Sequence, residues 1–152
     1  MKKIIALGLF CLGLNKVSAQ KIKEAEVPAI VKEGFKKSFP NLKAEEWEKE
    51  GTNFEVEFDQ NKTESSALFD TNGNLLETEI EITAKELPKN TIDYLTKNIP
   101  SKKIKEASKT TNSNGVVTYE AEVNDTDYIF DSTGNFIKKE VEKDDKDDNK
   151  NK

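Results

Sequence analysis

Four landmarks of this sequence occur twice, in the same order and at nearly constant spacing. Val27-Pro28 and Phe39-Pro40 return 60 residues later as Leu87-Pro88 and Ile99-Pro100. The segment 54–58 (FEVEF) returns after 65 residues as YEAEV, and 69–74 (FDTNGN) returns after 61 residues as FDSTGN. Internal similarity of this kind is typical of a repeated supersecondary unit. We therefore predict a tandem duplication, with repeat one at about residues 27–82 and repeat two at about residues 87–142.

Each repeat begins with a predicted helix that a proline ends. Val31, Phe35 and Phe39 are spaced by four residues, and so are Thr91, Leu95 and Ile99, so each set lies along one side of its helix. Pro28 and Pro88 fit a first helical turn, where the missing N–H costs nothing. Pro40 and Pro100 disfavour the helical conformation of the residue before them and end each helix.

Four strands are predicted after each helix, with short turns between them. They cover residues 43–50, 54–58, 64–69 and 75–82 in repeat one, and 103–109, 117–123, 127–130 and 136–142 in repeat two. Residues 110–115 are expected to form a longer loop. Short connections favour antiparallel hairpins, and Trp47 is expected in the core. The predicted fold class is α+β: a tandem repeat of a helix plus a four-stranded antiparallel sheet, with the helices packed on one sheet face.

The first residues have the character of a cleavable signal peptide. Lys2 and Lys3 precede an apolar stretch at residues 4–14 that is too short to span a bilayer, and Val17-Ser18-Ala19 offers small residues at a cleavage site. We expect cleavage after Ala19, which would remove Cys11 and leave a cysteine-free chain in the periplasm or outside the cell. The predicted organisation is a signal peptide at 1–19, a domain at 20–142 and a disordered tail at 143–152.

Charge argues against two classes of partner. The chain has 24 lysines and no arginine, and the predicted signal peptide holds three of the lysines, so 24 − 3 = 21 lysines remain against 29 acidic residues. The resulting net charge of 21 − 29 = −8 and the lack of arginine disfavour nucleic-acid binding. The same negative balance disfavours adsorption to an anionic membrane surface.

Several of these landmarks together resemble a known family. The pattern is Val27-Pro28, Phe35, Phe39-Pro40, Trp47-Glu48, Phe54-Glu55-Val56, Phe69-Asp70 and Gly73-Asn74-Leu75. It resembles the PepSY-like, β-lactamase-inhibitor-like (BLIP-like) domains of secreted bacterial proteins, over about residues 27–141. The resemblance implies a layered module whose sheet offers a concave face to an enzyme, and PepSY domains are thought to restrain peptidases. The inhibitor carries disulfides and the mature chain here would not, so no inhibitory loop residue is carried over.

The sequence offers little for catalysis, and no cofactor or metal is expected. The chain has no histidine, so nucleophilic catalysis would depend on a Ser–Lys pair such as Ser101-Lys102, which is better explained as a solvated turn. The glutamates alternate with apolar residues, as on an exposed sheet face, rather than forming a pair for glycoside hydrolysis. Asp70-Thr71-Asn72-Gly73 has glycine fourth instead of sixth, so the calcium-loop spacing fails and a hairpin turn is predicted.

Alternation along the strands predicts one acidic face. Its members are the carboxylates and apolar residues Glu55, Glu57, Leu68, Leu75, Glu77, Glu79, Glu81, Glu120, Glu122, Ile129 and Phe136. The simplest interpretation is a solvated sheet surface, but crowded like charges are unfavourable and interspersed apolar residues are typical of a binding patch. We therefore predict a non-catalytic protein-binding module, whose partner would be another envelope or extracellular protein and whose role could be inhibition of a peptidase or a β-lactamase. The alternative is an envelope protein that sequesters small cations or peptides.

Overall fold

The computed structural model describes residues 19–100 and 103–141. The predicted signal peptide and tail, and the Ser101-Lys102 pair, lie outside these residues, apart from Ala19 at the predicted cleavage site. Two α-helices are present in the described residues: α1 (Ala29–Ser38) and α2 (Lys89–Asn98). Each follows a short 3-10 helix, η1 (Glu24–Glu26) or η2 (Ala84–Glu86). Neither α-helix has the length and apolar character needed to cross a membrane.

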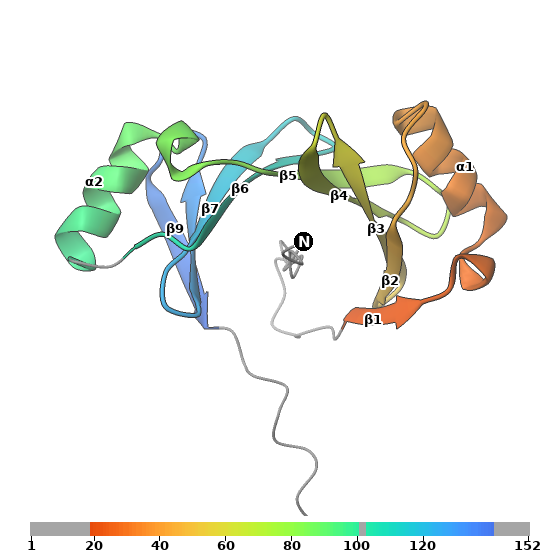
Figure 1. Cartoon of the computed structure of the whole chain (residues 1–152), viewed down its shortest axis with the longest axis horizontal. Coiled ribbons are helices and arrows are strands. Elements are labelled where there is room, and N and C mark those ends of the chain that lie inside the picture. The colour runs from red at the N-terminus through yellow and green to blue at the C-terminus, as the bar shows by residue number, and fades with distance from the viewer. Residues whose placement is uncertain (1–18, 101–102, 142–152) are drawn as a thin grey trace, which may run out of the picture. The chain divides into compact units, whose positions relative to one another are not determined.

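Nine strands follow one another in the sheet in their order along the chain (Figure 1). They are β1 (Ala19–Ile22), β2 (Glu46–Glu50), β3 (Asn53–Gln60), β4 (Thr63–Phe69), β5 (Leu75–Glu81), β6 (Glu106–Asn112), β7 (Val117–Glu122), β8 (Thr126–Asp131) and β9 (Phe136–Val141). The predicted fold class, a tandem repeat of a helix plus a four-stranded sheet, is therefore wrong. Residues 19–100 and 103–141 form one nine-stranded antiparallel sheet with two short α-helices.

One sheet forms instead of two because backbone hydrogen bonds continue the pairing beyond β5, and the ninth strand is β1 at the edge of the sheet. Two separate sheets would leave unpaired strand edges, but the Ser113 N–H donates to the Leu76 carbonyl and the Ile82 N–H donates to the Ala107 carbonyl. The pairing extends into the segment that was predicted to be a long loop, because β6 runs to Asn112. Strand β1 was missed altogether. It is a short polar edge strand without an alternating pattern, and it pairs with β2 from Ala19 opposite Glu50 to Ile22 opposite Trp47.

The chain divides into two compact units, which are described separately below. The first comprises the described residues up to Glu81 together with 109–117, and the second comprises 82–108 and the described residues from Thr118 onward.

In the first unit, α1 lies against one face of β2–β5 (Figure 1). Val31 and Phe35 are buried beneath the helix, as their spacing predicted. The Phe35 ring contacts four aromatic rings: Phe39, Trp47, Phe58 and Phe69, at centroid distances of 5.6, 5.9, 5.3 and 6.5 Å. The predicted core position of Trp47 is confirmed, since it is only 4% exposed. This aromatic cluster fixes which face of the sheet the helix covers.

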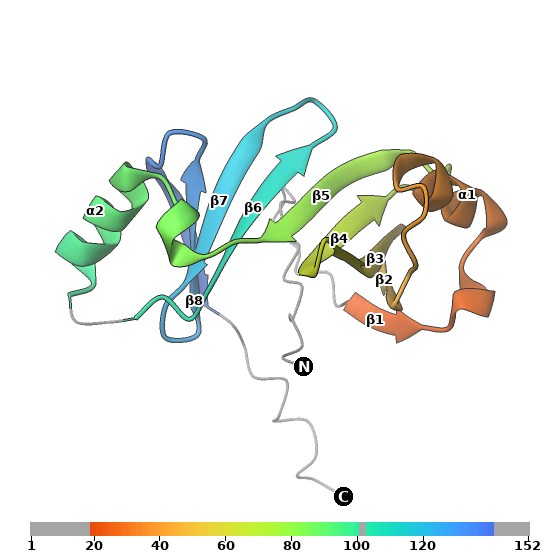
Figure 2. The same ribbon diagram turned by 45° about the horizontal axis from the view of Figure 1, so that its top comes forward.

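In the second unit, α2 lies beside β8 and β9 (Figure 2). Thr91 and Leu95 are buried on the inner side of the helix. Tyr94 stacks on Phe136 of β9 with centroids 4.7 Å apart, and it meets Phe130 of β8 edge-on at 5.5 Å. The core of this unit is less aromatic than that of the first, with Leu95, Ala107 and Ala121 among its buried residues.

The turn between β4 and β5 contacts α1 through glycine. Gly73 has φ +76°, and a Cβ there would lie 2.3 Å from the Ile30 carbonyl oxygen. A Cβ on Gly34 of the helix would meet the Gly73 carbonyl oxygen at 2.2 Å. Only glycine at both positions allows this approach, so the turn and the helix hold each other in place.

Candidate functional site

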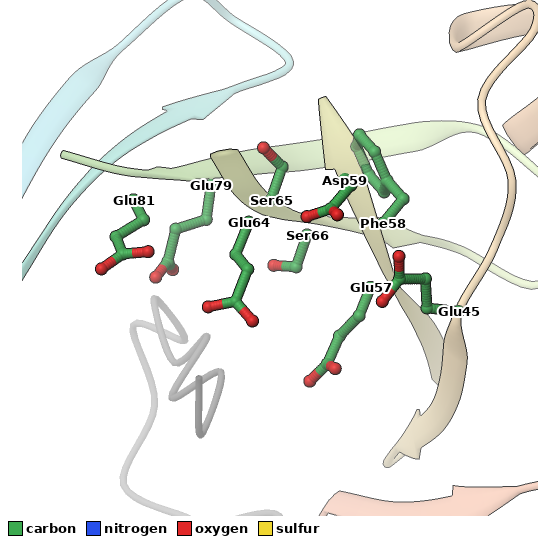
Figure 3. A pocket seen from close by; sticks show the side chains of 9 residues that line it. All are labelled: Glu45, Glu57, Phe58, Asp59, Glu64, Ser65, Ser66, Glu79 and Glu81. Atoms are coloured by element: carbon green, nitrogen blue, oxygen red, sulfur yellow. The ribbon is translucent and has the colours of Figure 1, made fainter. Parts of the chain in front are cut away.

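The side of β2–β5 that α1 does not cover is lined with carboxylates. Alternation sends Trp47, Val56 and Phe58 to the core and their neighbours to the opposite side. In Figure 3, Glu57, Glu64 and Glu79 project to the same side of the strands, while Phe58 points away from them. We call this surface the acidic face. It consists of Glu46, Glu48, Glu50, Glu55, Glu57, Glu64, Glu77, Glu79 and Glu81, together with Ser66 and Leu68.

The strand register places like charges opposite one another. Glu46 lies opposite Glu57, and Glu48 lies opposite Glu55. Glu46, Glu48 and Glu57 each have a carboxylate oxygen within 4.8 Å of the others, and Lys21 of β1 forms an ion pair with Glu46. That spacing is within reach of a single cation, but partly exposed carboxylates often gather without one, and we assign no metal site here.

Two shallow hollows lie on the acidic face. The larger has about 370 Å³ of empty space, open solvent included, and is lined by Glu45, Glu57, Phe58, Asp59, Glu64, Ser65, Ser66, Glu79 and Glu81 (Figure 3). The smaller has about 220 Å³ counted in the same way, and it is lined by Glu50, Glu55, Ser66, Leu68, Glu77 and Glu79. Ser66 and Glu79, which lie opposite each other on β4 and β5, line both hollows.

Crowding and burial change the acidity of these groups. Burial raises the pKa of Glu55 to about 8, against a smaller opposite effect of the Ser66 hydroxyl that hydrogen bonds to it. Burial, together with the charge of neighbouring glutamates, also raises the pKa of Glu50 and Glu77 to about 7 and that of Glu57 to about 6. The pKa of Glu48 is raised by the same two causes. The acidic face therefore gains much of its charge close to neutral pH, because desolvation disfavours the ionised form.

Raised carboxyl pKa values also occur in general acids of enzymes. Here they are spread over three strands of an open surface, β2, β3 and β5, whereas small-molecule sites are usually concave and enclose most of their ligand. The arrangement is suited to holding a cationic surface by charge and hydrogen bonding.

The structure brings together six of the residues that the sequence predicted for this surface. Glu55, Glu57, Leu68, Glu77, Glu79 and Glu81 all lie on the acidic face. Glu55 is nevertheless not solvated, because only 3% of it is exposed.

The predicted placement of Leu75 and Phe136 on that surface is wrong. Leu75 packs against the core of the first unit, and the Phe136 ring stacks on Tyr94 of α2. In both cases a β-bulge changes the alternation, at Leu68/Phe69 and at Ile129/Phe130. Each bulge adds one residue to one strand, so Leu75 lies on the other side of the sheet from Glu77, and Phe136 on the other side from Lys138.

Glu120, Glu122 and Ile129 belong to the second unit. Glu120 lies opposite Ile129, and Glu122 lies opposite Asp127. Glu122 is 5% exposed and accepts a hydrogen bond from the Lys105 ammonium, with Nζ and Oε1 2.7 Å apart. The residues that were predicted as one patch are therefore distributed over both units.

Sequence reasoning missed the contribution of β2 and the start of β4. Glu46, Glu48 and Glu50 alternate with Trp47 and Lys49, and Glu64 alternates with Ser65. The signal was available, since a core tryptophan fixes the direction of its strand and sends the flanking glutamates to the other side.

The two aspartate turns are hairpin connections, as predicted. The Asp70 Oδ1 accepts hydrogen bonds from the N–H groups of Asn72 and Asn74 at 2.8 and 2.9 Å. Asp131 Oδ1 accepts the same pair from Thr133 and Asn135 at 2.8 and 2.9 Å. Hydrogen bonds, led by those from Asn74, lower the pKa of Asp70, and these carboxylates serve the turns.

Comparison with known proteins agrees with this architecture. A family model described as "Putative beta-lactamase-inhibitor-like, PepSY-like" matches residues 15–76 and again residues 60–138. A search among curated proteins gave no significant match.

Among solved structures, the chain is similar to a DUF2874 family protein from Bacteroides uniformis (18% identity, TM-score 0.67), with 74% of this chain and 88% of that chain covered. It is similar to a "putative periplasmic" protein from Bacteroides eggerthii (13% identity, TM-score 0.68), with 75% and 88% covered. It is also similar to a BLIP-like protein from Bacteroides fragilis (21% identity, TM-score 0.61), with 78% and 89% covered. At these identities the likeness establishes the fold alone.

Proposed function

The chain belongs to the PepSY-like, β-lactamase-inhibitor-like family, and from this premise we propose that it is a non-catalytic periplasmic module that binds a basic protein surface through its acidic face. The family description and the periplasmic description of a structural neighbour support the class of protein and its location. The absence of histidine from the sequence supports a role other than acid–base or nucleophilic catalysis.

One observation carries the proposal: carboxylates lie directly opposite carboxylates on the sheet face that points away from α1. Glu48 opposite Glu55 is unfavourable for the isolated fold, and Lys21 of β1 offsets only part of the repulsion between Glu46 and Glu57. A basic partner would turn this repulsion into attraction and would supply hydrogen-bond donors to the half-buried oxygens. Leu68, which lies among the carboxylates in the smaller hollow, would add an apolar contact.

Charge-matched variants test the proposal. The double variant Glu48→Lys with Glu57→Lys reverses the charge at two half-buried positions of the acidic face (the face pair). The double variant Glu24→Lys with Glu33→Lys changes the net charge by the same amount at exposed positions elsewhere (the control pair). Glu55 is left unchanged because it is too buried to accept a lysine. We expect the parent and the control pair to retain a stoichiometric protein from an envelope extract, and the face pair to lose it, with circular dichroism confirming that all three are folded.

The association kinetics of the purified complex complete the test. Steering by exposed charges weakens as salt rises, because the screening length is about 10 Å at 0.1 M salt. We expect association with the parent to slow with added salt and association with the face pair to be slow throughout. Equal retention by all three proteins would contradict the proposal, and retention of small cations without protein would favour the sequestration alternative.

A further inference from the structure

Glu55 is the most buried carboxylate of the acidic face, and side chains from three neighbouring strands, β2, β4 and β5, surround it. Its exposed fraction is 3%. Glu48 and Glu50 approach it from β2, and Glu79 approaches it from β5, each adding negative charge. On β4 the Ser66 hydroxyl hydrogen bonds to it, and Leu68 lies directly opposite in the register. Burial and these like charges disfavour the ionised form of Glu55 more strongly than the Ser66 hydroxyl favours it.

The neighbouring carboxyls are in similar surroundings. Glu77 lies opposite Leu68 and is influenced by Glu79 and Glu50. Glu57 has Glu46 and Glu48 on β2 and Glu64 on β4 as like charges, with Lys21 of β1 acting in the opposite direction. Because these groups interact, their protons leave in coupled steps that belong to the cluster rather than to single residues.

We propose that the acidic face is a pH-controlled docking surface, which releases a basic partner when its clustered carboxyl groups take up protons and holds it when they ionise. This inference rests on the proposed function and adds its regulation. The geometry supports this inference, because Glu55 is enclosed and lies opposite Glu48, and both the loss of water and the like charge disfavour its ionised form. Burial and neighbouring charge set the relevant range, with pKa values of about 6 for Glu57, about 7 for Glu50 and Glu77, and about 8 for Glu55.

A partner rich in lysine keeps its own charge across this range, because lysine titrates near pH 10.4. Any change of affinity between about pH 5.5 and about pH 8.5 then reports the carboxyl groups of this protein. An oligolysine peptide is a suitable probe, and isothermal titration calorimetry at constant ionic strength measures its affinity for the full chain.

We expect the affinity to rise about tenfold or more from about pH 5.5 to about pH 8.5, equivalent to about 1.4 kcal/mol per factor of ten. Glu55→Gln with Glu77→Gln should remove most of that rise, since an amide cannot gain the charge. The matched control, Glu24→Gln with Glu33→Gln, loses the same number of carboxyls away from the face and should keep the rise. Carbon NMR of the Glu55 carboxyl in the parent follows its ionisation directly.

Failure of the pH dependence and failure of the proposed function give different results. If oligolysine binds with the same affinity at all pH values, or if the Glu55→Gln, Glu77→Gln variant keeps the full rise, the switch is overturned while the docking surface stands. If no oligolysine binds at any pH, the proposed function itself is contradicted. Should the double variant fail to fold, Glu50→Gln with Glu57→Gln tests the same cluster at less buried positions.

Discussion

The two units carry similar runs of glutamate but arrange their charges differently. In the first unit, Glu48 lies opposite Glu55 and Glu46 lies opposite Glu57, and Lys21 of β1 forms an ion pair with Glu46 at the edge of this group. In the second, Glu122 forms an ion pair with Lys105, and Glu140 forms one with Lys138, both with Nζ and Oε1 2.7 Å apart. A run such as FEVEF or YEAEV therefore does not determine the electrostatics of its face. The lysines on neighbouring strands decide whether a glutamate row is repulsive or compensated.

The cores differ as well. The first unit is centred on the Phe35 ring and its four aromatic neighbours. In the second unit the corresponding helix position is Leu95, beside the small Ala107 and Ala121. A larger aromatic core opposite the acidic face gives the first unit more stabilising contacts to offset its like-charge pairs.

The largest expected effect comes from the two helix core positions. Phe35→Ala should lower the free energy of unfolding by about 3–5 kcal/mol, because it removes a ring that touches four others. Leu95→Ala should lower it by less, about 2–4 kcal/mol, because the small side chains of its alanine neighbours make fewer contacts with the leucine that is removed. Urea unfolding measures both. The exposed Lys36→Ala and Lys97→Ala serve as controls and should stay within about 0.5 kcal/mol. Equal losses at Phe35 and Leu95 would remove the contrast between the two cores.

The second effect is the pH dependence of stability. Glu50, Glu55, Glu57 and Glu77 have pKa values raised above the ordinary 4.5. Their stabilising contribution is therefore present below about pH 4.5 and is lost as pH rises through about 6 to 8, because the unfolded chain ionises more readily. The free energy of unfolding should fall by about 2–3 kcal/mol between about pH 5 and about pH 8.5.

Glu55→Gln should flatten that slope, since an amide resembles the protonated acid and does not ionise. Glu33→Gln, on the exposed side of α1, is the control and should leave the slope unchanged. Stability that rises over this range in the parent would show that the acidic face is better solvated than its geometry indicates.

Much of the fold was accessible from the sequence because its signals were local. The four-residue spacing of Val31 and Phe35 and the prolines around them predicted α1, and the same pattern at Thr91 and Leu95 predicted α2. Alternation found eight of the nine strands, with their ends shifted by a few residues. The joining of these strands into one sheet was not predictable in this way, because it depends on backbone hydrogen bonds such as that from Ser113 to Leu76, which carry no side-chain signature.

The candidate site was predicted less completely, for two physical reasons. The bulges at Leu68/Phe69 and Ile129/Phe130 break the two-residue period, so Leu75 and Phe136 moved to the helix side. Burial is also a collective property: Glu55 is enclosed by side chains of the strands on either side of it, and its own neighbours in sequence do not reveal this. The role of the acidic face in binding stays a prediction.

The smallest expected effect concerns the lysines that compensate the second unit. The side chain of Lys105 is 56% exposed but its partner Glu122 is only 7% exposed, whereas Lys138 and Glu140 are 34% and 26% exposed. A buried carboxylate that loses its lysine partner stays poorly solvated, whereas a more exposed carboxylate can hydrogen bond to water instead. Lys105→Met should therefore cost about 1–3 kcal/mol, and Lys138→Met under about 1 kcal/mol. A double-mutant cycle with Glu122→Gln isolates the pair, since Lys105→Met should cost much less when Glu122 is already neutral. If Lys105→Met costs no more than Lys138→Met, compensation by lysine does not distinguish the second unit, and the contrast between the two glutamate rows would rest on the first unit alone.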